Sequence, residues 1–301
     1  MPNHLASKLP LSIIIVCRER WPALRMALDA LHPQALAVGA EIIAAISDPD
    51  AVAPDAGRTY PAVTWLRGKR EDSVFQLRAL ALSHCRAEII GMTEDHAWVE
   101  ADWCRAILDA HAQYPDAAAI GGVVENSATG SLADWAGFLI VNGQFMHPIQ
   151  NGPSDVTSLQ ANVSYKRRAL PESFPEYGFV SSIVLHQLRG NGAQIVATDR
   201  MVAYHMQALS LRGHGAAHFH NARSTAAFLR VTAPKSAWLA GYVVLVPATI
   251  ARTPAVGFGK RRHRRELLLG LPLMVWLACC HAAGELIGHL AGPGDSPQRV
   301  E

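Results

Sequence analysis

Cysteine is scarce in this sequence and follows no motif spacing. The chain of 301 residues contains five cysteines and no Cys-x-x-Cys pair. Structural zinc sites and the disulfide frameworks of small secreted domains both depend on regularly spaced cysteines, so neither is expected here. The odd number favours reduced thiols in a cytosolic setting. The five are Cys17, Cys85, Cys104, Cys279 and Cys280.

Charge is also sparse, and the sequence shows no secretory signal. Charged residues make up 17% of the chain, hydrophobic residues 50%, and the formal net charge is +2. Nothing in this balance indicates a nucleic-acid partner. The first apolar run, Leu11 to Cys17, is too short for a signal peptide and is followed at once by the charged residues Arg18, Glu19 and Arg20. We therefore expect a cytoplasmic catalytic or binding domain.

The first 125 residues show a regular alternation of strand and helix patterns. Continuous β-branched apolar runs predict strands that are buried on both faces of a parallel sheet, and apolar residues at helical spacing predict helices between them. The expected strands are 11–17, 41–46, 63–66, 88–92 and 117–124, and the expected helices are 22–31, 73–83 and 102–114. This rhythm is typical of an α/β domain with a doubly wound, mostly parallel sheet.

Acidic residues directly follow two of the expected strands. Asp48 and Asp50 follow the second, and the turn Thr93-Glu94-Asp95-His96 follows the fourth. Doubly wound sheets bind ligands at the carboxyl ends of their strands. Oxygen and nitrogen donors grouped there can hold a divalent cation, with phosphates completing its coordination shell. The alternative is a solvated loop that caps the next helix through Asp102.

The pattern is less regular after residue 126. We expect helices over 132–141 and 181–189, and strands over 159–165, 193–197 and 199–205. The polar segment 212–230 contains His214, His218 and His220, but no cysteine lies nearby, which is weak support for a closed zinc site. We expect this segment to form a loop at the mouth of the site, in contact with phosphate or acceptor.

The order of these features resembles that of family-two glycosyltransferases of the GT-A fold. In that family an arginine-bearing helix precedes a strand that ends in an acidic Asp-x-Asp-like motif, and Arg78 and Glu94-Asp95-His96 hold those places here. His205 falls where the family often has a late histidine that completes the metal site. The resemblance extends over roughly residues 10–230. Within this range, further segments that match the family pattern are 12–16, Ser47-Asp48, Gly121-Gly122-Val123 and 162–168.

The resemblance implies a metal-assisted, inverting transfer of sugar from a nucleotide-diphosphate donor to a lipid-linked or polysaccharide acceptor. The implied metal is Mg²⁺ or Mn²⁺, and its implied ligands are Glu94, Asp95, His96 and His205. The implied contacts to nucleotide and phosphate are Asp48, Asp50, Arg78, Glu94 and Arg223. For Arg223, a solvated helical face or a contact with membrane phosphates is an equal alternative. The implied divisions are a nucleotide-sugar half (1–125), an acceptor half (126–232) and a membrane-associated tail (233–301).

The chain departs from the family pattern at the general base and in the acidic motif, where His96 replaces a common Asp. Ser181 or Ser182 stands where inverting members carry an acid, and serine is not a base at its ordinary pKa. Glu176 is the nearest replacement, and Asp95 is the other carboxylate assigned to catalysis. Three possibilities stay open: a relocated base, an ionised acceptor such as a polyprenyl phosphate, and a relative that only binds nucleotide sugar.

The tail combines two apolar runs with a basic loop. Runs 237–250 and 267–280 are shorter than the roughly 20 residues of a bilayer span. Two crossings would put the basic loop 252–265 outside the cell, against the positive-inside tendency. We therefore expect 237–290 to lie in the cytoplasmic leaflet of the membrane, with paired core helices as the alternative. The glycine-rich end, with Gly284 and Gly288, resembles that of some membrane-associated family members and permits close helix packing.

A nucleotidyltransferase is the second enzyme class that this pattern fits. It shares the α/β architecture and a metal-carboxylate site. Its phosphate-binding loop after the first strand would be rich in glycine, whereas Cys17 to Trp21 contains none. This absence favours the glycosyltransferase.

Overall fold

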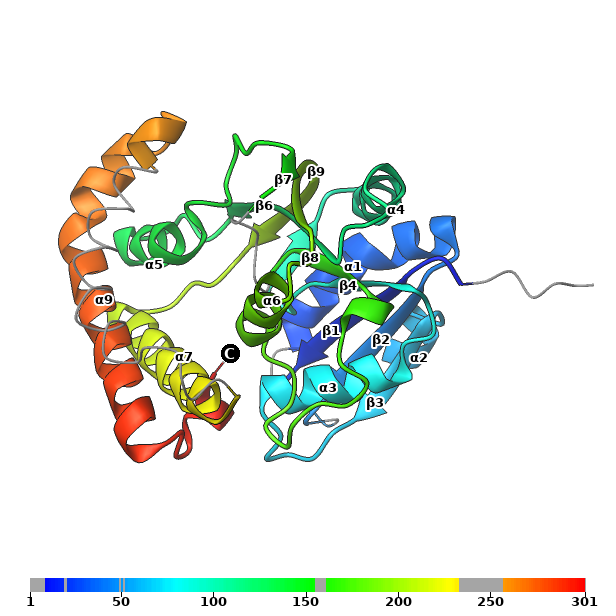
Figure 1. Ribbon diagram of the computed structural model, residues 1–301, viewed down its shortest axis with the longest axis horizontal. Helices are drawn as coiled ribbons and strands as arrows, with labels where there is room; N and C mark the ends of the chain where they lie inside the picture. Colours follow the sequence, from blue (N-terminus) through cyan, green and yellow to red (C-terminus); the bar gives the residue numbers. More distant parts are fainter. Residues whose placement is uncertain are drawn as a thin grey trace, which may run out of the picture.

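The computed structural model describes residues 9–18, 21–48, 50, 52–154, 161–232 and 257–300. Within them, nine strands form one sheet in the order β3-β2-β1-β4-β8-β6-β9-β5, and β7 pairs with β9 (Figure 1). The strands are β1 (Ser12–Cys17), β2 (Glu41–Ile46), β3 (Val63–Arg67), β4 (Ile89–Met92), β5 (Ala97–Val99), β6 (Ala119–Asn126), β7 (Gly152–Pro153), β8 (Val163–Lys166) and β9 (Ile195–His205). The helices are α1 (Trp21–Val38), α2 (Ala56–Thr59), α3 (Val74–His84), α4 (Trp103–Gln113), α5 (Leu132–Asn142), α6 (Ser181–Gly190), α7 (Leu211–Thr232) and α9 (Arg264–Ala291), with short 3-10 turns η2 (Arg167–Ala169) and η3 (Ser296–Arg299).

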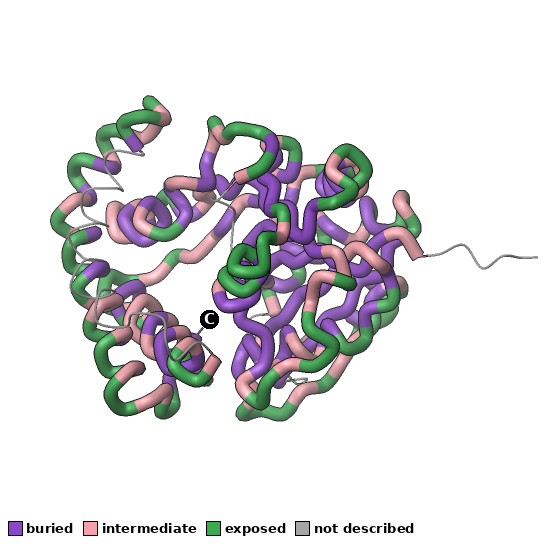
Figure 2. Tube along the Cα trace, viewed as in Figure 1, coloured by how far each residue is buried: buried purple, intermediate pink, exposed green. Residues whose placement is uncertain are grey.

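The sheet is mixed but mostly parallel, as the alternation of patterns predicts. Strands β1, β2, β3 and β4 are parallel neighbours, and β6 and β9 run in the same direction beyond the reversed strand β8. All six residues of β1 and of β2 are buried, which is why their sequences are continuous apolar runs. Figure 2 shows that the strands are largely buried, whereas the outer turns of the helices are exposed.

Two apolar cores cover the two faces of the sheet. On one face, Leu28 of α1 and Trp103 of α4 pack with Ile13 and other alternate residues of the central strands. On the opposite face, Phe75 of α3 and other residues of α3 and α6 pack with Ile14 and its alternates. Helix α3 begins at a capping box, in which Ser73 and Gln76 exchange side-chain and backbone hydrogen bonds. The layers fix the strand ends rigidly relative to one another.

Helices α5, α7 and α9 form a separate group beside the sheet, at the left of Figure 1. The expectation of a loop over 212–230 is wrong, because this segment belongs to the 22-residue helix α7. Its histidines and glycines give a weak helical pattern, and the helix is stabilised by packing along α9 instead. A side chain at Gly284 or Gly288 would collide with the carbonyl oxygen of Phe219 or Arg223 in α7. The expected close approach at these glycines is thus confirmed.

Helix α9 is long and apolar enough, by length and composition, to cross a membrane, and a third of its most apolar stretch is buried within the protein. Several of its large apolar residues are exposed: Leu268, Leu269, Val275, Trp276, Leu286, Ile287 and Leu290. Of these, Trp276 also packs against Gly215 of α7. The other apolar run of the tail, 237–250, lies outside the described residues.

Candidate metal and donor site

The acidic turn Thr93 to His96 connects β4 to the short strand β5. Strand β5 pairs antiparallel with the end of β9, so that Ala97 lies opposite His205. The backbone N–H of Met206 donates to the carbonyl of His96 over 2.8 Å, which ties the turn to the end of β9. Strands β4 and β9 point the same way, so the turn and His205 meet at the carboxyl ends of the strands, which we call the sheet edge. Ligands bind at this end of the strands in such folds.

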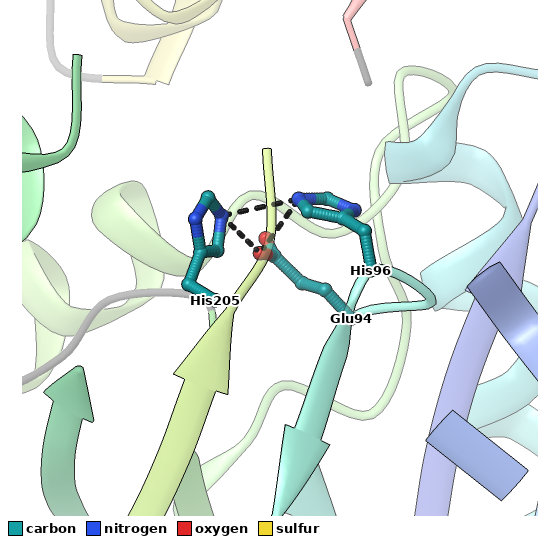
Figure 3. A group of neighbouring side chains, drawn as sticks. All are labelled: Glu94, His96 and His205. Carbon is teal, nitrogen blue, oxygen red and sulfur yellow. Dashed lines mark hydrogen bonds and ion pairs between the residues drawn. The ribbon is translucent and has the colours of Figure 1, made fainter. Parts of the chain in front are cut away.

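Glu94, His96 and His205 converge at this edge (Figure 3). One carboxylate oxygen of Glu94 lies 3.4 Å from Nε2 of His96 and 3.3 Å from Nε2 of His205. The two Nε2 atoms are 3.1 Å apart. All three residues are buried.

Burial and charge set the protonation states of this cluster. Burial alone would raise the pKa of Glu94, but the hydrogen bond from His205 and the nearby His96 and Arg78 lower it to about 2. Burial also lowers the pKa of His205, an effect that the hydrogen bond to Glu94 opposes only in part. At neutral pH the cluster therefore offers an ionised carboxylate and a neutral imidazole, the forms that bind metal.

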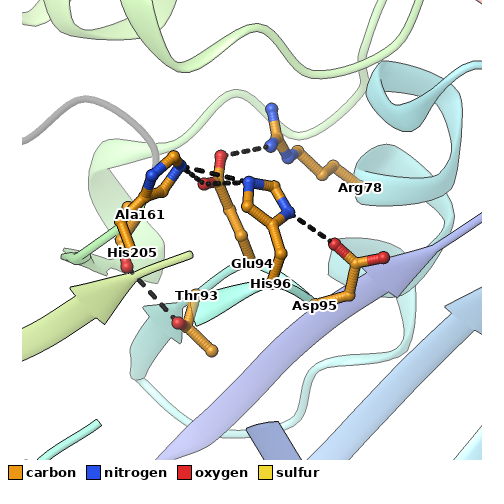
Figure 4. Close-up of polar contacts among 7 residues, drawn as sticks. All are labelled: Arg78, Thr93, Glu94, Asp95, His96, Ala161 and His205. Atoms are coloured by element: carbon orange, nitrogen blue, oxygen red, sulfur yellow. Dashed lines mark hydrogen bonds and ion pairs between the residues drawn. The ribbon is translucent and has the colours of Figure 1, made fainter. Parts of the chain in front are cut away.

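Asp95 contacts the cluster through His96 (Figure 4). Its Oδ1 lies 2.8 Å from Nδ1 of His96. A proton on Nδ1 that is donated to this carboxylate makes Nε2 of His96 the nitrogen with the lone pair, on the side of Glu94 and His205. On the other side of the turn, the hydroxyl of Thr93 donates to the carbonyl of Ala161 over 3.3 Å. The direct ligation of metal by Asp95 stays a prediction.

The spacing of these donors fits a divalent cation. Adjacent ligands that each lie about 2.1 Å from one ion are separated by about 3 Å. The three separations in the cluster, 3.1, 3.3 and 3.4 Å, are close to that value. Three protein ligands leave further coordination positions for oxygen atoms of a substrate.

Arg78 supplies a buried positive charge beside the cluster. It extends from α3, and its Nη2 lies 3.4 Å from the second carboxylate oxygen of Glu94 (Figure 4). Burial lowers its pKa, and the charge of Glu94 opposes this effect. Its buried Nη1 has no hydrogen-bond partner among the described residues. A buried guanidinium with an unused donor fits an anionic ligand, because such groups otherwise pair with a carboxylate or phosphate.

A cavity of about 280 Å³ opens from this cluster toward the helices. Glu94, His96 and His205 line one part of it, and Ser182 of α6 lies on its wall. The remaining lining residues come mainly from α5, α7 and α9, together with Val300. The site therefore lies between the sheet edge and the helical group.

The other candidate residues lie away from the three-residue cluster. Asp48 pairs with Arg70 over 3.1 Å, and the backbone N–H of Asp50 donates to Asp48. Glu176 is exposed, and its backbone carbonyl accepts a hydrogen bond from Gln76. Arg223 donates to the carbonyl of Gly292 over 3.0 Å. None of the four lines the described cavity, and their proposed roles stay predictions.

Sequence reasoning missed the contribution of the helical group to this site. Asp134 of α5 and His214 of α7 form a buried pair, and both line the cavity. His281 and Glu285 of α9 line it as well, although their segment has the composition of a membrane-associated tail. The i, i+4 spacing of these two polar residues on one side of an apolar helix is the signal that could have identified them.

The C-terminal turn η3 also reaches the site. The guanidinium of Arg18, which follows β1, donates to the carbonyl of Gln298. Nδ1 of His220 in α7 lies 2.9 Å from the hydroxyl of Ser296. Val300 is buried in the same core as Phe75. This turn thus connects the helical group to the sheet.

No protein-family model matches the chain, and no curated protein matches it in sequence. Solved structures match it in fold. The mannosyltransferase PcManGT from Pyrobaculum calidifontis, in complex with GDP-Man and Mn²⁺, has a TM-score of 0.56 and 16% identity, over 93% of this chain and 88% of that one. TarS 1-349 from S. aureus, in complex with UDP-GlcNAc, has a TM-score of 0.52 and 11% identity, over 92% and 90%. The expected GT-A-like glycosyltransferase fold is confirmed.

Proposed function

We propose that the chain transfers a sugar from a nucleotide-diphosphate donor, with the help of a divalent metal. The cluster of Glu94, His96 and His205 beside the buried, partly unpaired Arg78 carries this proposal. It combines three possible metal ligands with an anion-binding group at the carboxyl ends of the strands, where such sheets bind their ligands. The fold supports it, since PcManGT was solved with GDP-Man and Mn²⁺ and TarS with UDP-GlcNAc.

Each member of the site has a distinct task. Glu94, His96 and His205 hold the metal, and Asp95 orients His96 and can add a ligand. Arg78 donates to the diphosphate. A bound metal neutralises the charge that develops on the leaving nucleoside diphosphate. Imidazole ligands suit transition metals better than Mg²⁺, so we propose Mn²⁺ as the preferred ion.

The remaining donor contacts follow from the expected division of the chain. Residues 1–125 bind the nucleotide, with Asp48 and Asp50 at the end of β2 holding the base or ribose. Residues 126–232 bind the acceptor, and 233–301 form the tail. Arg223 donates through Nε to the carbonyl of Gly292, and the other donors of its guanidinium are its proposed contacts to phosphate.

The tail binds the cytoplasmic face of a membrane and brings the site to a lipid-linked or glycan acceptor. The exposed apolar side of α9 and the basic residues Arg261, Arg264 and Arg265 at its start support this part of the proposal. Fractionation tests it: the full-length chain should sediment with membranes, and a chain that is soluble without detergent would contradict it.

A thermal-shift screen tests the donor proposal. The full-length protein is heated with UDP-, GDP- and dTDP-sugars, with and without Mn²⁺, and we expect one donor to raise the melting temperature only when the metal is present. Product analysis then separates the enzyme classes. A glycosyltransferase releases nucleoside diphosphate, whereas a nucleotidyltransferase releases or consumes pyrophosphate, and a binding-only relative forms neither product. Failure of every donor to bind would overturn the proposal.

A further inference from the structure

The cavity beside the metal cluster is lined by three carboxylates from different elements. Glu94 belongs to the turn after β4, Asp134 to α5 and Glu285 to α9. A sugar acceptor that enters this cavity meets the donor site at one end and the helical group at the other. An inverting transfer to a hydroxyl also requires a base to remove its proton. Ser181 and Ser182 cannot supply one, and Glu176 is exposed and does not line this cavity.

Two of the three carboxylates are fully engaged. Glu94 lies among Arg78, His96 and His205. Asp134 accepts hydrogen bonds from the hydroxyl of Ser131 at 2.7 Å, the backbone N–H of Leu209 at 3.0 Å and Nε2 of His214 at 3.1 Å. Each is therefore surrounded by three donors or cations, which makes it a weaker base than a carboxylate oxygen without a partner.

Glu285 differs from both. Its Oε2 is buried and has no hydrogen-bond partner within the described part of the chain. Burial raises its pKa. Two histidines also line the cavity, His281 one turn earlier on α9 and His218 of α7, and burial lowers the pKa of both.

The backbone of α9 holds Glu285 firmly against α7. A Cβ atom at Gly284 would lie 2.2 Å from the carbonyl oxygen of Phe219, and one at Gly288 would lie 2.3 Å from that of Arg223. The two glycines lie on either side of Glu285 and let α9 pack directly on the backbone of α7. The backbone that carries Glu285 is therefore closely packed beside the cavity.

We infer that Glu285 is the general base of the proposed transfer and that the cavity between the metal cluster and α9 receives an acceptor hydroxyl. The inference rests on the proposed function. The hydroxyl oxygen attacks the anomeric carbon of the donor sugar and forms the new glycosidic bond. Its proton passes to the Glu285 carboxylate. The bond from the anomeric carbon to the β-phosphate oxygen breaks, and its electron pair leaves with the nucleoside diphosphate.

Glu285→Gln tests the inference in the full-length, Mn²⁺-loaded protein, with the donor that the thermal-shift screen selects. Water and octyl glycosides serve as hydroxyl acceptors, and nucleoside diphosphate release and glycoside formation are measured. We expect both rates to fall about 100-fold or more, while the Kd of the donor changes less than about 3-fold. The melting temperature should not fall, because the substitution removes an unpaired buried charge. Glu266→Gln, on the same helix but outside the cavity, should behave like the unaltered chain.

A second variant separates chemistry from structure. In Glu285→Ala, sodium azide, an anionic acceptor that carries no proton to remove, should restore sugar transfer. If Glu285→Gln transfers sugar to hydroxyl acceptors at the rate of the unaltered chain, the inference is overturned. It is also overturned if the affinity of Glu285→Gln for the donor falls as much as its rate of transfer. Absence of donor binding and turnover in the unaltered chain would instead overturn the proposed function.

Discussion

Nε2 of His96 and Nε2 of His205 lie 3.1 Å apart, although 109 residues separate them in the chain. Two imidazole nitrogens at this distance share one proton or bind one cation. The carboxylate of Glu94 lies 3.3 to 3.4 Å from both, so the three groups are spaced for the divalent cation that we propose.

His205→Ala should therefore weaken Mn²⁺ binding. Loss of a residue that only hydrogen-bonds to a metal ligand typically lowers metal affinity about 10- to 100-fold. Removing one of the three ligands themselves should therefore lower the affinity for Mn²⁺ at least tenfold. Isothermal titration with MnCl₂ measures the effect. His84→Ala, at an exposed position of α3, is the matched control. Equal Mn²⁺ affinities for the two variants would show that the cluster does not hold the metal.

Asp95→Asn tests the role of the carboxylate behind His96. The amide no longer favours a proton on Nδ1, so Nε2 of His96 becomes a poorer ligand. We expect Mn²⁺ affinity to fall about 10- to 100-fold, as is usual for a partner of a ligating histidine. Metal-dependent donor binding should weaken with it, and unchanged binding would remove Asp95 from the site. Asp48→Asn, at the end of β2, should leave the affinity for Mn²⁺ unchanged.

Arg78→Met tests the diphosphate contact. The substitution removes the unused donor Nη1, and hydrogen bonds to charged groups contribute about 1.5–3 kcal/mol. The Kd for nucleoside diphosphate should rise about 10- to 100-fold in the presence of Mn²⁺. Arg105→Met, exposed on α4, controls for loss of charge. An equal Kd for the two variants would place the diphosphate elsewhere.

Strands β1 and β2 could be predicted from the sequence because all of their residues are buried. Apolar runs such as Ser12–Cys17 leave few alternatives to a parallel strand, and the acidic turn necessarily lies at a strand end. The proximity of His205 to Glu94 was indicated only by the order of motifs, because it depends on the tertiary pairing of β9 with β5, the strand that follows the turn. The three-residue strand β5, which clamps the turn, is too short for any periodicity.

The helical group could not be predicted for a different reason. Helix α7 has a weak amphipathic pattern, and it is stabilised by contact with α9 rather than by its own composition. In α9, Glu285 interrupts an apolar run, and composition alone cannot distinguish a membrane tail from a cavity wall. The packing of Gly284 on Phe219 and the lining of the cavity by His281 and Glu285 show which side of the helix faces inward.

Stability should decrease at mildly acid pH because of buried histidines. Burial lowers the pKa of His111 and of His218 to about 3. The unfolded chain binds protons at these groups below about pH 6.5, and the folded chain does not until about pH 3. Their contribution is thus complete above pH 6.5 and is lost as the pH falls, by about 1.4 kcal/mol per pH unit for each histidine. Urea unfolding between pH 7 and 5 measures the slope. His111→Asn should reduce this slope by about 1.4 kcal/mol per pH unit, the contribution of one histidine, whereas His84→Ala should leave it unchanged.

Gly284→Val should separate donor binding from transfer. The new side chain meets the carbonyl oxygen of Phe219 at 2.2 Å, a backbone atom that cannot rotate away, so α9 must move from α7. Such overpacking costs about 1–3 kcal/mol, which lowers the melting temperature by several degrees. Glu285 is the next residue and moves with the helix, so sugar transfer to hydroxyl acceptors should fall. Mn²⁺-dependent donor affinity should persist, because the metal cluster belongs to the sheet edge. Ala283→Val, one residue earlier at an exposed position, carries the same side chain without the collision and should leave the melting temperature and transfer unchanged. Retention of transfer by Gly284→Val despite a lowered melting temperature would show that the position of α9 does not matter to the reaction.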